Sequence, residues 1–165
     1  LGFLFAGVNI MLVAYFSASG VTAEVAEKLA QAIGADLFEI RPQQPYTAAD
    51  LDWRDQHSRS SVEMQDAAAR PAMAEQTPDM AQYDTVFLGF PIWWYTAPRI
   101  IQTFLEGGDF SGKQIVPFAT SGGSGLGHTV DDLRASCGTD TCWQPGRLCN
   151  GRIEVNALKE WARQF

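Results

Sequence analysis

MLVAYFSASGVT, residues 11–22, decides the fold of this chain. Residues 11–14 are apolar and predict a buried strand, and hydroxyl residues with a glycine follow before a helical pattern begins near Thr22. A helix that begins there leaves its first N–H groups without intrahelical partners, and its dipole adds partial positive charge. The stretch therefore predicts a strand, a turn and a helix N-terminus that is suited to an anion.

The turn is suited to one phosphate group held by neutral donors. Ser17, Ser19 and Thr22 offer hydroxyl groups, which can donate to phosphate oxygens. Gly20 allows a positive φ or a close approach of the backbone. No Lys or Arg occurs in residues 11–27, and the Gly-x-x-x-x-Gly-Lys-Ser/Thr loop of triphosphate sites is absent. The alternative is that Ser19 or Thr22 only caps the helix, as such residues do at many helix starts.

Length and composition describe one folded domain. The chain has 165 residues, of which 46% are apolar and 19% charged, as is ordinary for a globular protein with a buried core. The net charge of −7 argues against a nucleic-acid surface, which requires a basic face. We therefore expect a cytoplasmic protein that binds neither nucleic acid nor membrane.

Residues 1–10 form an uncharged, mostly apolar run ahead of this domain. The run is too short to span a bilayer and lacks the basic segment and the cleavage site of a signal peptide. Met11 stands where a native start would fall. We interpret residues 1–10 as an extension from cloning or gene prediction, with a truncated export or anchor segment as the alternative, and residues 11–165 as a single domain.

The cysteines and histidines do not predict a metal site. Cys137, Cys142 and Cys149 match no zinc signature and no Cys-x-x-Cys motif, so we expect loop or core thiols. A disulfide between Cys137 and Cys142 is the alternative for an oxidising compartment. His57 and His128 are not at metal-ligand spacing, and we expect His128 at a helix start, with ligand contact as the alternative.

Strand and helix patterns alternate along the chain. Strands are predicted at residues 11–14, 36–40, 85–90 and 114–119, the last containing Pro117, and a fifth within 138–153. Helices are predicted at residues 22–33, ended by Gly34, near 60–69, from Pro98 to an end at residues 107–108, and at 129–136 with a Thr129–Asp132 capping pattern. A last helix is predicted with Asn156 as its cap and with Leu158, Trp161 and Phe165 facing inward. This alternation predicts an α/β fold with an open, doubly wound parallel sheet, whose ligands bind outside the carboxyl ends of the strands.

The loops after the predicted strands therefore identify the ligand. Residues 91–98 hold three consecutive aromatic rings, which need something flat or apolar to cover them, and residues 120–127 offer the backbone groups of a glycine-rich loop. The alternatives are a plug or dimer contact for the rings and a flexible linker for the glycines. With the turn after the first strand, the loops describe a ligand with a phosphate, a polar middle and a planar ring system. Flavin mononucleotide (FMN) has all three parts. Within the long polar connection of residues 42–83, Tyr46 and Trp53 are candidates to cap this site.

These residues resemble the flavodoxin-like family, in particular bacterial flavodoxins and flavodoxin-like FMN-dependent oxidoreductases. The resemblance covers residues 11–165 and is carried by residues 17–22, by Gly-Phe-Pro-Ile-Trp-Trp at 89–94 within 83–98, and by 112–127. It implies a five-stranded sheet in the order 2-1-3-4-5 with helices on both faces, noncovalent FMN and electron transfer, with no catalytic side chain. The implied cofactor-binding residues are Ser17, Ser19, Gly20, Val21 and Thr22 at the phosphate, Pro91, Ile92, Trp93, Trp94 and Tyr95 at the isoalloxazine, and Ser121, Gly122, Gly123 and Gly125 at the ring edge or ribityl chain.

One departure from the family bears on function. Electron-carrier flavodoxins usually stack an aromatic residue from the strand-four loop on the second flavin face, and residues 121–127 contain none. An open second face would admit a hydride donor or a quinone. We expect an FMN-binding electron-transfer protein. The first alternative is an NAD(P)H-dependent FMN or quinone oxidoreductase on the same fold, and the second alternative is a non-redox module that binds a phosphate ester. The expected partner is a redox protein or a small electron acceptor, and a homodimer is one option.

Overall fold

A computed structural model of the protein describes residues 10–165. The extension expected at residues 1–10 lies outside this range except for Ile10, whose carbonyl oxygen accepts a hydrogen bond from the Asp84 N–H. None of the helices in the described range is long and apolar enough to cross a membrane.

The centre of the molecule is an open parallel sheet in the order β2-β1-β3-β4-β5, which confirms the predicted fold and strand order. The strands are β1 (Met11–Tyr15), β2 (Asp36–Glu39), β3 (Thr85–Pro91), β4 (Gln114–Thr120) and β5 (Cys142–Trp143), and β6 (Arg147–Leu148) also pairs with β4. All of the pairings are parallel, and β1 lies between β2 and β3 in register. The carboxyl ends of these strands therefore lie along one edge, where the loops that follow them come together.

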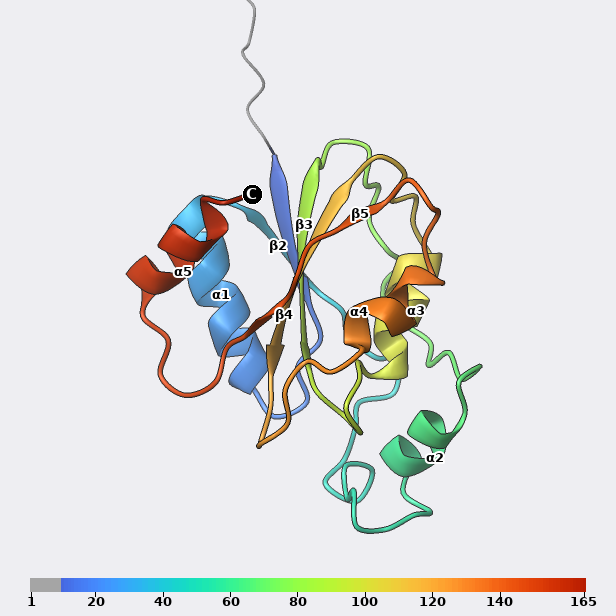
Figure 1. Ribbon diagram of the computed structural model, residues 1–165. Coiled ribbons are helices and arrows are strands. Elements are labelled where there is room, and N and C mark those ends of the chain that lie inside the picture. The colour runs from blue at the N-terminus through green and yellow to red at the C-terminus, as the bar shows by residue number, and fades with distance from the viewer. Residues whose placement is uncertain (1–9) are drawn as a thin grey trace, which may run out of the picture.

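Helices cover both faces of the sheet (Figure 1). One face carries α1 (Val21–Ile33) and α5 (Val155–Ala162), and the other carries α3 (Arg99–Glu106) and α4 (Thr129–Arg134). The short α2 (Arg59–Gln65) stands away from the sheet within the long connection between β2 and β3. It is shorter than the predicted 60–69, because Asp66 leaves the helical conformation at φ −114° and ψ 105°.

Each face of the sheet has its own hydrophobic core. Strand β3 contributes to both, because its side chains alternate: Val86, Leu88 and Phe90 pack toward α3, while Phe87 packs toward α1 and α5. All of these side chains are fully buried, and each contributes about 1.5–3 kcal/mol by burial. This agrees with the unbroken apolar pattern of the predicted strand, which is typical of a strand covered on both faces.

The fifth strand is interrupted opposite Pro117. The N–H groups of Gln144 and Cys149 donate to the carbonyl oxygens of Ile115 (2.9 Å) and Ala119 (2.7 Å). Pro117 lies between these two residues on the same edge of β4, where it has no N–H to offer. The partner strand is therefore split into β5 and β6, both within the predicted range of 138–153.

Two predicted helix caps are wrong. His128, not Thr129, is the N-cap residue of α4, and the carboxylate of Asp132 bonds the Thr96 hydroxyl instead of closing a capping box. The N-cap residue of the last helix is Glu154, whose side chain makes no capping hydrogen bond, and Asn156 lies inside α5. His128 thus stands at a helix start as expected.

Candidate functional site

Three loops meet at one cavity of about 330 Å³ at the carboxyl edge of the sheet. They are the turn after β1, the segment after β3 and the glycine-rich loop after β4. The lining residues are Ser19, Val21, Pro91, Ile92, Trp93, Thr120, Ser121, Gly122, Asn150 and Gly151. The structure thus brings together part of each predicted residue group. The other predicted residues, Ser17, Gly20, Thr22, Trp94, Tyr95, Gly123 and Gly125, do not line this cavity.

The turn after β1 is organised by Ser17 and Gly20. Gly20 is the N-cap residue of α1 at φ 92°, a conformation that favours glycine, as predicted. The Ser17 Oγ accepts hydrogen bonds from the N–H groups of Gly20 and Ala23, both at 3.1 Å. Ser17 therefore takes the capping role that the alternative interpretation gave to Ser19 or Thr22. Its own hydroxyl proton is left to donate to an anion.

The first turn of α1 presents backbone donors. Within residues 10–165, the N–H groups of Val21 and Thr22 have no hydrogen-bond acceptor. The side chain of Thr22 is 1% exposed, and its hydroxyl lies 2.8 Å from that of Thr120. Thr22 thus has a backbone N–H available to an anion, while its side chain joins the turn to the end of β4.

The segment after β3 is a tight hairpin with Trp94 and Tyr95 at its tip. Trp93 and Thr96 exchange two backbone hydrogen bonds of 2.9 and 3.1 Å. Trp94 and Tyr95 have φ values of 48° and 65°, the left-handed conformation required at both central positions of a type I′ turn. This conformation is costly for bulky side chains and is concentrated at functional sites. The two residues are nevertheless 44% and 67% exposed, so the turn leaves both rings at the surface.

Trp93 anchors the hairpin. Its ring makes edge-to-face contacts with Phe16 and Tyr46, with centroids 5.6 and 5.4 Å apart. The Tyr46 hydroxyl donates a hydrogen bond to the Glu63 carboxylate, and the Arg59 guanidinium lies 3.8 Å from the centroid of the Tyr46 ring. Burial and the bond to Glu63 raise the pKa of Tyr46 above its ordinary value, so this residue remains a neutral phenol.

The glycine-rich loop is folded around Ser121. The Ser121 Oγ accepts hydrogen bonds from the N–H groups of Gly123 (3.1 Å) and Ser124 (2.8 Å), and the Ser121 N–H donates to Asn150 Oδ1 (2.7 Å). Asn150 and Gly151 line the cavity but were not predicted from the sequence. Both lie just after the last strand segment, β6, separated from it by Cys149. A sequence in which that strand could be recognised would therefore have indicated them as the other loop residues were indicated.

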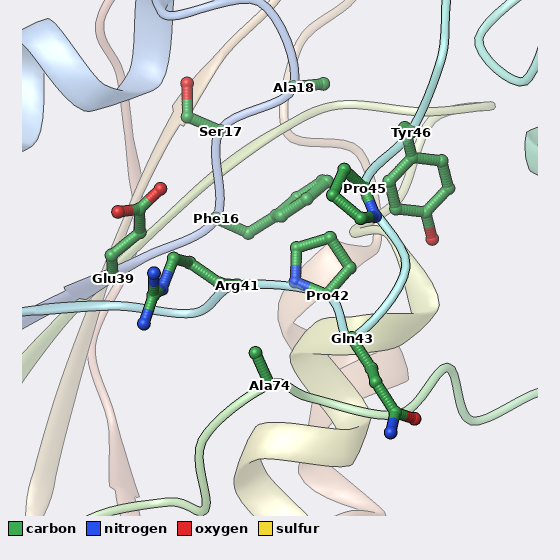
Figure 2. Close-up of a pocket in the computed structure, with 10 residues that line it drawn as sticks. All are labelled: Phe16, Ser17, Ala18, Glu39, Arg41, Pro42, Gln43, Pro45, Tyr46 and Ala74. Atoms are coloured by element: carbon green, nitrogen blue, oxygen red, sulfur yellow. The ribbon is translucent and has the colours of Figure 1, made fainter.

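Two further hollows lie beside the three-loop cavity. One lies between the turn after β1 and the long connection and is bordered by Ser17, Arg41 and Tyr46 (Figure 2). Its volume is about 380 Å³, and the Arg41 guanidinium pairs with Glu75. It contains no residue of the hairpin or of the glycine-rich loop. The other, of about 380 Å³, lies between the hairpin and the long connection and is lined by Leu51, Trp53, Ser60, Ile92, Trp93, Trp94 and Tyr95. Trp53 and Tyr46, the two candidate caps, thus border separate hollows.

Asp132 ties the hairpin to α4. Its Oδ2 accepts a hydrogen bond from the Thr96 hydroxyl (2.6 Å) and lies 2.8 Å from His128 Nδ1. These three residues border a cavity with Trp94. The imidazole of His128 is therefore held beside the exposed aromatic tip.

Comparison with known proteins agrees with this geometry. The Flavodoxin family profile matches residues 10–165. The structure is similar to candidate flavoproteins from Bacteroides uniformis (48% identity, TM-score 0.88, covering 94% of this chain and 98% of that one) and Bacteroides eggerthii (51%, 0.87, 94% and 96%). A flavoprotein in complex with FMN from Lactobacillus acidophilus shares the fold at 20% identity, with a TM-score of 0.67 and coverage of 94% and 99%. A comparison with curated proteins gives no match. The chain belongs to the flavodoxin family.

Proposed function

We propose that this protein binds FMN at the three-loop cavity and transfers electrons. The observation that carries this proposal is the convergence of a phosphate-binding turn, an aromatic hairpin and a glycine-rich loop on one cavity. Membership of the flavodoxin family supports FMN as the cofactor. The Lactobacillus flavoprotein of the same fold, which is in complex with FMN, is consistent with it.

The donors at the first turn of α1 fit the phosphate group of FMN. The hydroxyls of Ser17 and Ser19 and the free N–H groups of Val21 and Thr22 would hold it, with the helix dipole adding favourable charge. No charged side chain lines the cavity among the described residues. Lys28, the first cation along the chain, is already bound to Glu24 (3.1 Å) and to the Ile153 carbonyl (3.4 Å).

The other two loops fit the flavin ring. Trp93 and Trp94 would flank the isoalloxazine, while the backbone of residues 121–125 would meet its polar edge. When bound, FMN supplies both one-electron and two-electron transfer, and the chain supplies position, exclusion of water and hydrogen bonds. Neither the phosphate turn nor the hairpin offers a charged side chain to this cavity. The protein would therefore act on the bound flavin through backbone dipoles and ring stacking.

An NAD(P)H-dependent oxidoreductase is the second candidate function. It is favoured by the composition of residues 121–127, which contain no aromatic ring to cover the second face of the flavin. A hydride donor would have access from that side. The electron-transfer partner is then a redox protein in the first case and a small acceptor in the second.

Titration of the apoprotein with FMN tests the shared part of both functions. We expect quenching of flavin fluorescence that saturates at one FMN per chain. A protein that remains colourless and leaves the flavin fluorescence unchanged would instead support the non-redox phosphate-ester module. Incubation of the loaded protein with NAD(P)H and a quinone then separates the redox functions. Steady NAD(P)H oxidation identifies the oxidoreductase, whereas no oxidation together with two separable one-electron potentials identifies the carrier.

A further inference from the structure

The cavity between the hairpin and the long connection is distinct from the three-loop cavity, although Trp93 and Trp94, which we place beside the isoalloxazine, also line it. Its volume is about 380 Å³, within the range of small-molecule sites. One wall consists of Leu51, Trp53 and Ser60, and the other of residues 92–95. It shares only Ile92 and Trp93 with the three-loop cavity, so the hairpin separates the two.

The lining of this cavity selects a neutral, planar ligand. No charged side chain lines it within the described residues, so it offers nothing to balance an ionic ligand. Three of its aromatic side chains, Trp53, Trp94 and Tyr95, are 70%, 44% and 67% exposed. Exposed rings around a hollow favour an aromatic ligand, which can stack on them and remove them from water.

Ser60, in the wall of this cavity, has a buried hydroxyl that lacks a hydrogen-bond partner among the described residues. Its side chain is 2% exposed. The neighbouring serines are satisfied, because Ser58 and Ser61 bond each other through their hydroxyls at 2.9 Å. The Ser60 backbone is fixed by a 3.0 Å bond to the Asp50 carbonyl, so rotation about Cα–Cβ is the motion that brings the hydroxyl to a ligand. A buried hydroxyl without a partner is unfavourable and requires a reason.

We propose that this cavity binds a neutral aromatic carbonyl compound of the quinone class, whose oxygen is hydrogen-bonded by Ser60. A serine hydroxyl donates to the carbonyl oxygen of a quinone and accepts from the hydroxyl of the hydroquinone, so it satisfies both forms. Binding does not depend on FMN, but a role as acceptor site rests on the proposed function. In that role reduced FMN (FMNH2) gives up two electrons and two protons and returns to oxidised FMN, and the quinone takes up two electrons and two protons to give the hydroquinone.

Calorimetric titration with duroquinone tests the site, because all of its ring carbons are substituted and resist addition of cysteine thiols. The full chain binds this probe with the same Kd with and without FMN. Ser60→Ala weakens binding by about three- to tenfold through loss of one hydrogen bond. Trp53→Ala also weakens it, through loss of a stacking ring. Ser111→Ala, at the opposite end of the sheet, leaves the Kd unchanged. Equal affinity in all of the variants overturns the proposal, as does competition between duroquinone and FMN, which would show that the cavity seats the flavin ring itself.

The folding of the variants supplies an independent readout. Ser60→Ala removes an unpartnered buried hydroxyl, so its midpoint of urea unfolding equals or exceeds that of the parent protein while its affinity for duroquinone falls. A lower midpoint with unchanged affinity would show that the hydroxyl is structural and would overturn the proposal. FMN titration of the parent protein separates this proposal from the previous one. A parent protein that binds duroquinone but not FMN would contradict the FMN function alone.

Discussion

The hydroxyl oxygens of Thr22 and Thr120 lie 2.8 Å apart, across 98 positions of the sequence. Both side chains are buried, at 1% and 4% exposure, so each hydroxyl is the partner of the other. Thr22 stands in the first turn of α1 and Thr120 at the end of β4. Their contact therefore fixes the distance between the phosphate turn and the glycine-rich loop, the two ends of the candidate FMN site.

Thr120→Val is expected to lower the free energy of unfolding by about 1–3 kcal/mol, because it leaves the buried Thr22 hydroxyl without a partner. Thr22→Val has the same effect for the reciprocal reason. The double variant removes both hydroxyls and is expected to lose less than the sum of the two. Urea unfolding measures all three, with the exposed Thr139→Val as the matched control. Strictly additive losses would mean that the two hydroxyls are not coupled.

Ser17→Ala is expected to weaken FMN binding by about tenfold or more, since the phosphate loses one hydroxyl donor and the turn loses its organising acceptor. The N–H groups of Gly20 and Ala23 lose their partner as well, so stability falls by about 1 kcal/mol, as for other helix caps. Quenching of flavin fluorescence gives the affinity. Ser111→Ala should bind FMN like the parent protein. Unchanged affinity in Ser17→Ala would place the phosphate elsewhere.

Trp94→Ala is expected to weaken FMN binding and to shift the flavin absorption spectrum, because an aromatic ring flanking the isoalloxazine is lost. Stability should change little, since the Trp94 side chain is 44% exposed. Absorption spectra of the loaded protein and urea unfolding are the two measurements. Trp161→Phe on the far face of the sheet controls for nonspecific effects on the flavin. A large loss of stability with an unchanged spectrum would show that Trp94 packs only against protein.

The parts of the fold that depend only on residues close together in the sequence could be predicted from it. The apolar pattern of β3 and the glycine at the start of α1 are local signals, and the structure confirms both. The split of the fifth strand could not be predicted, because it depends on Pro117 in a different strand. The predicted cap of α4 was wrong for a similar reason, because Asp132 accepts a hydrogen bond from Thr96, 36 residues away in the sequence.

The candidate site was predictable as a set of loops but not as a set of contacts. The order of the parallel strands brings these loops together independently of the contacts that their side chains make. Ser17 was expected to donate to a phosphate, yet its oxygen first accepts two backbone N–H groups, which only the three-dimensional turn decides. Trp93 and Trp94 are adjacent in sequence, but positive φ at Trp94 directs them to different surroundings, one ring packed on Phe16 and the other largely exposed.

Gly89→Ala is expected to destabilise the protein by about 1–3 kcal/mol or more, as overpacking of a tight core does. A Cβ atom at this position would overlap the ring of Phe118 in the adjacent strand β4. Phe118→Leu in the same chain should recover part of the loss by making room. Urea unfolding of the single and double variants checks this, and a Gly89→Ala protein as stable as its parent would contradict the close packing.

The three cysteines are free in the structure, and their surroundings predict an order of reactivity. Burial, with the Glu106 carboxylate nearby, raises the pKa of Cys137 to about 11, and burial also raises the pKa of Cys149. The thiolate is the form that reacts, so a raised pKa keeps both thiols protonated at pH 8. We therefore expect iodoacetamide at pH 8 to modify the exposed Cys142 first, and Cys137 only as the pH approaches 11.

Mass spectrometry of peptides from the folded and the urea-unfolded protein measures this order. In urea all three thiols should react, because unfolding removes the burial that protects two of them. A disulfide between Cys137 and Cys142 would leave both unreactive even in urea, until a reductant is added. That result would contradict the free thiols of the structure and point to an oxidising compartment, where such bonds persist.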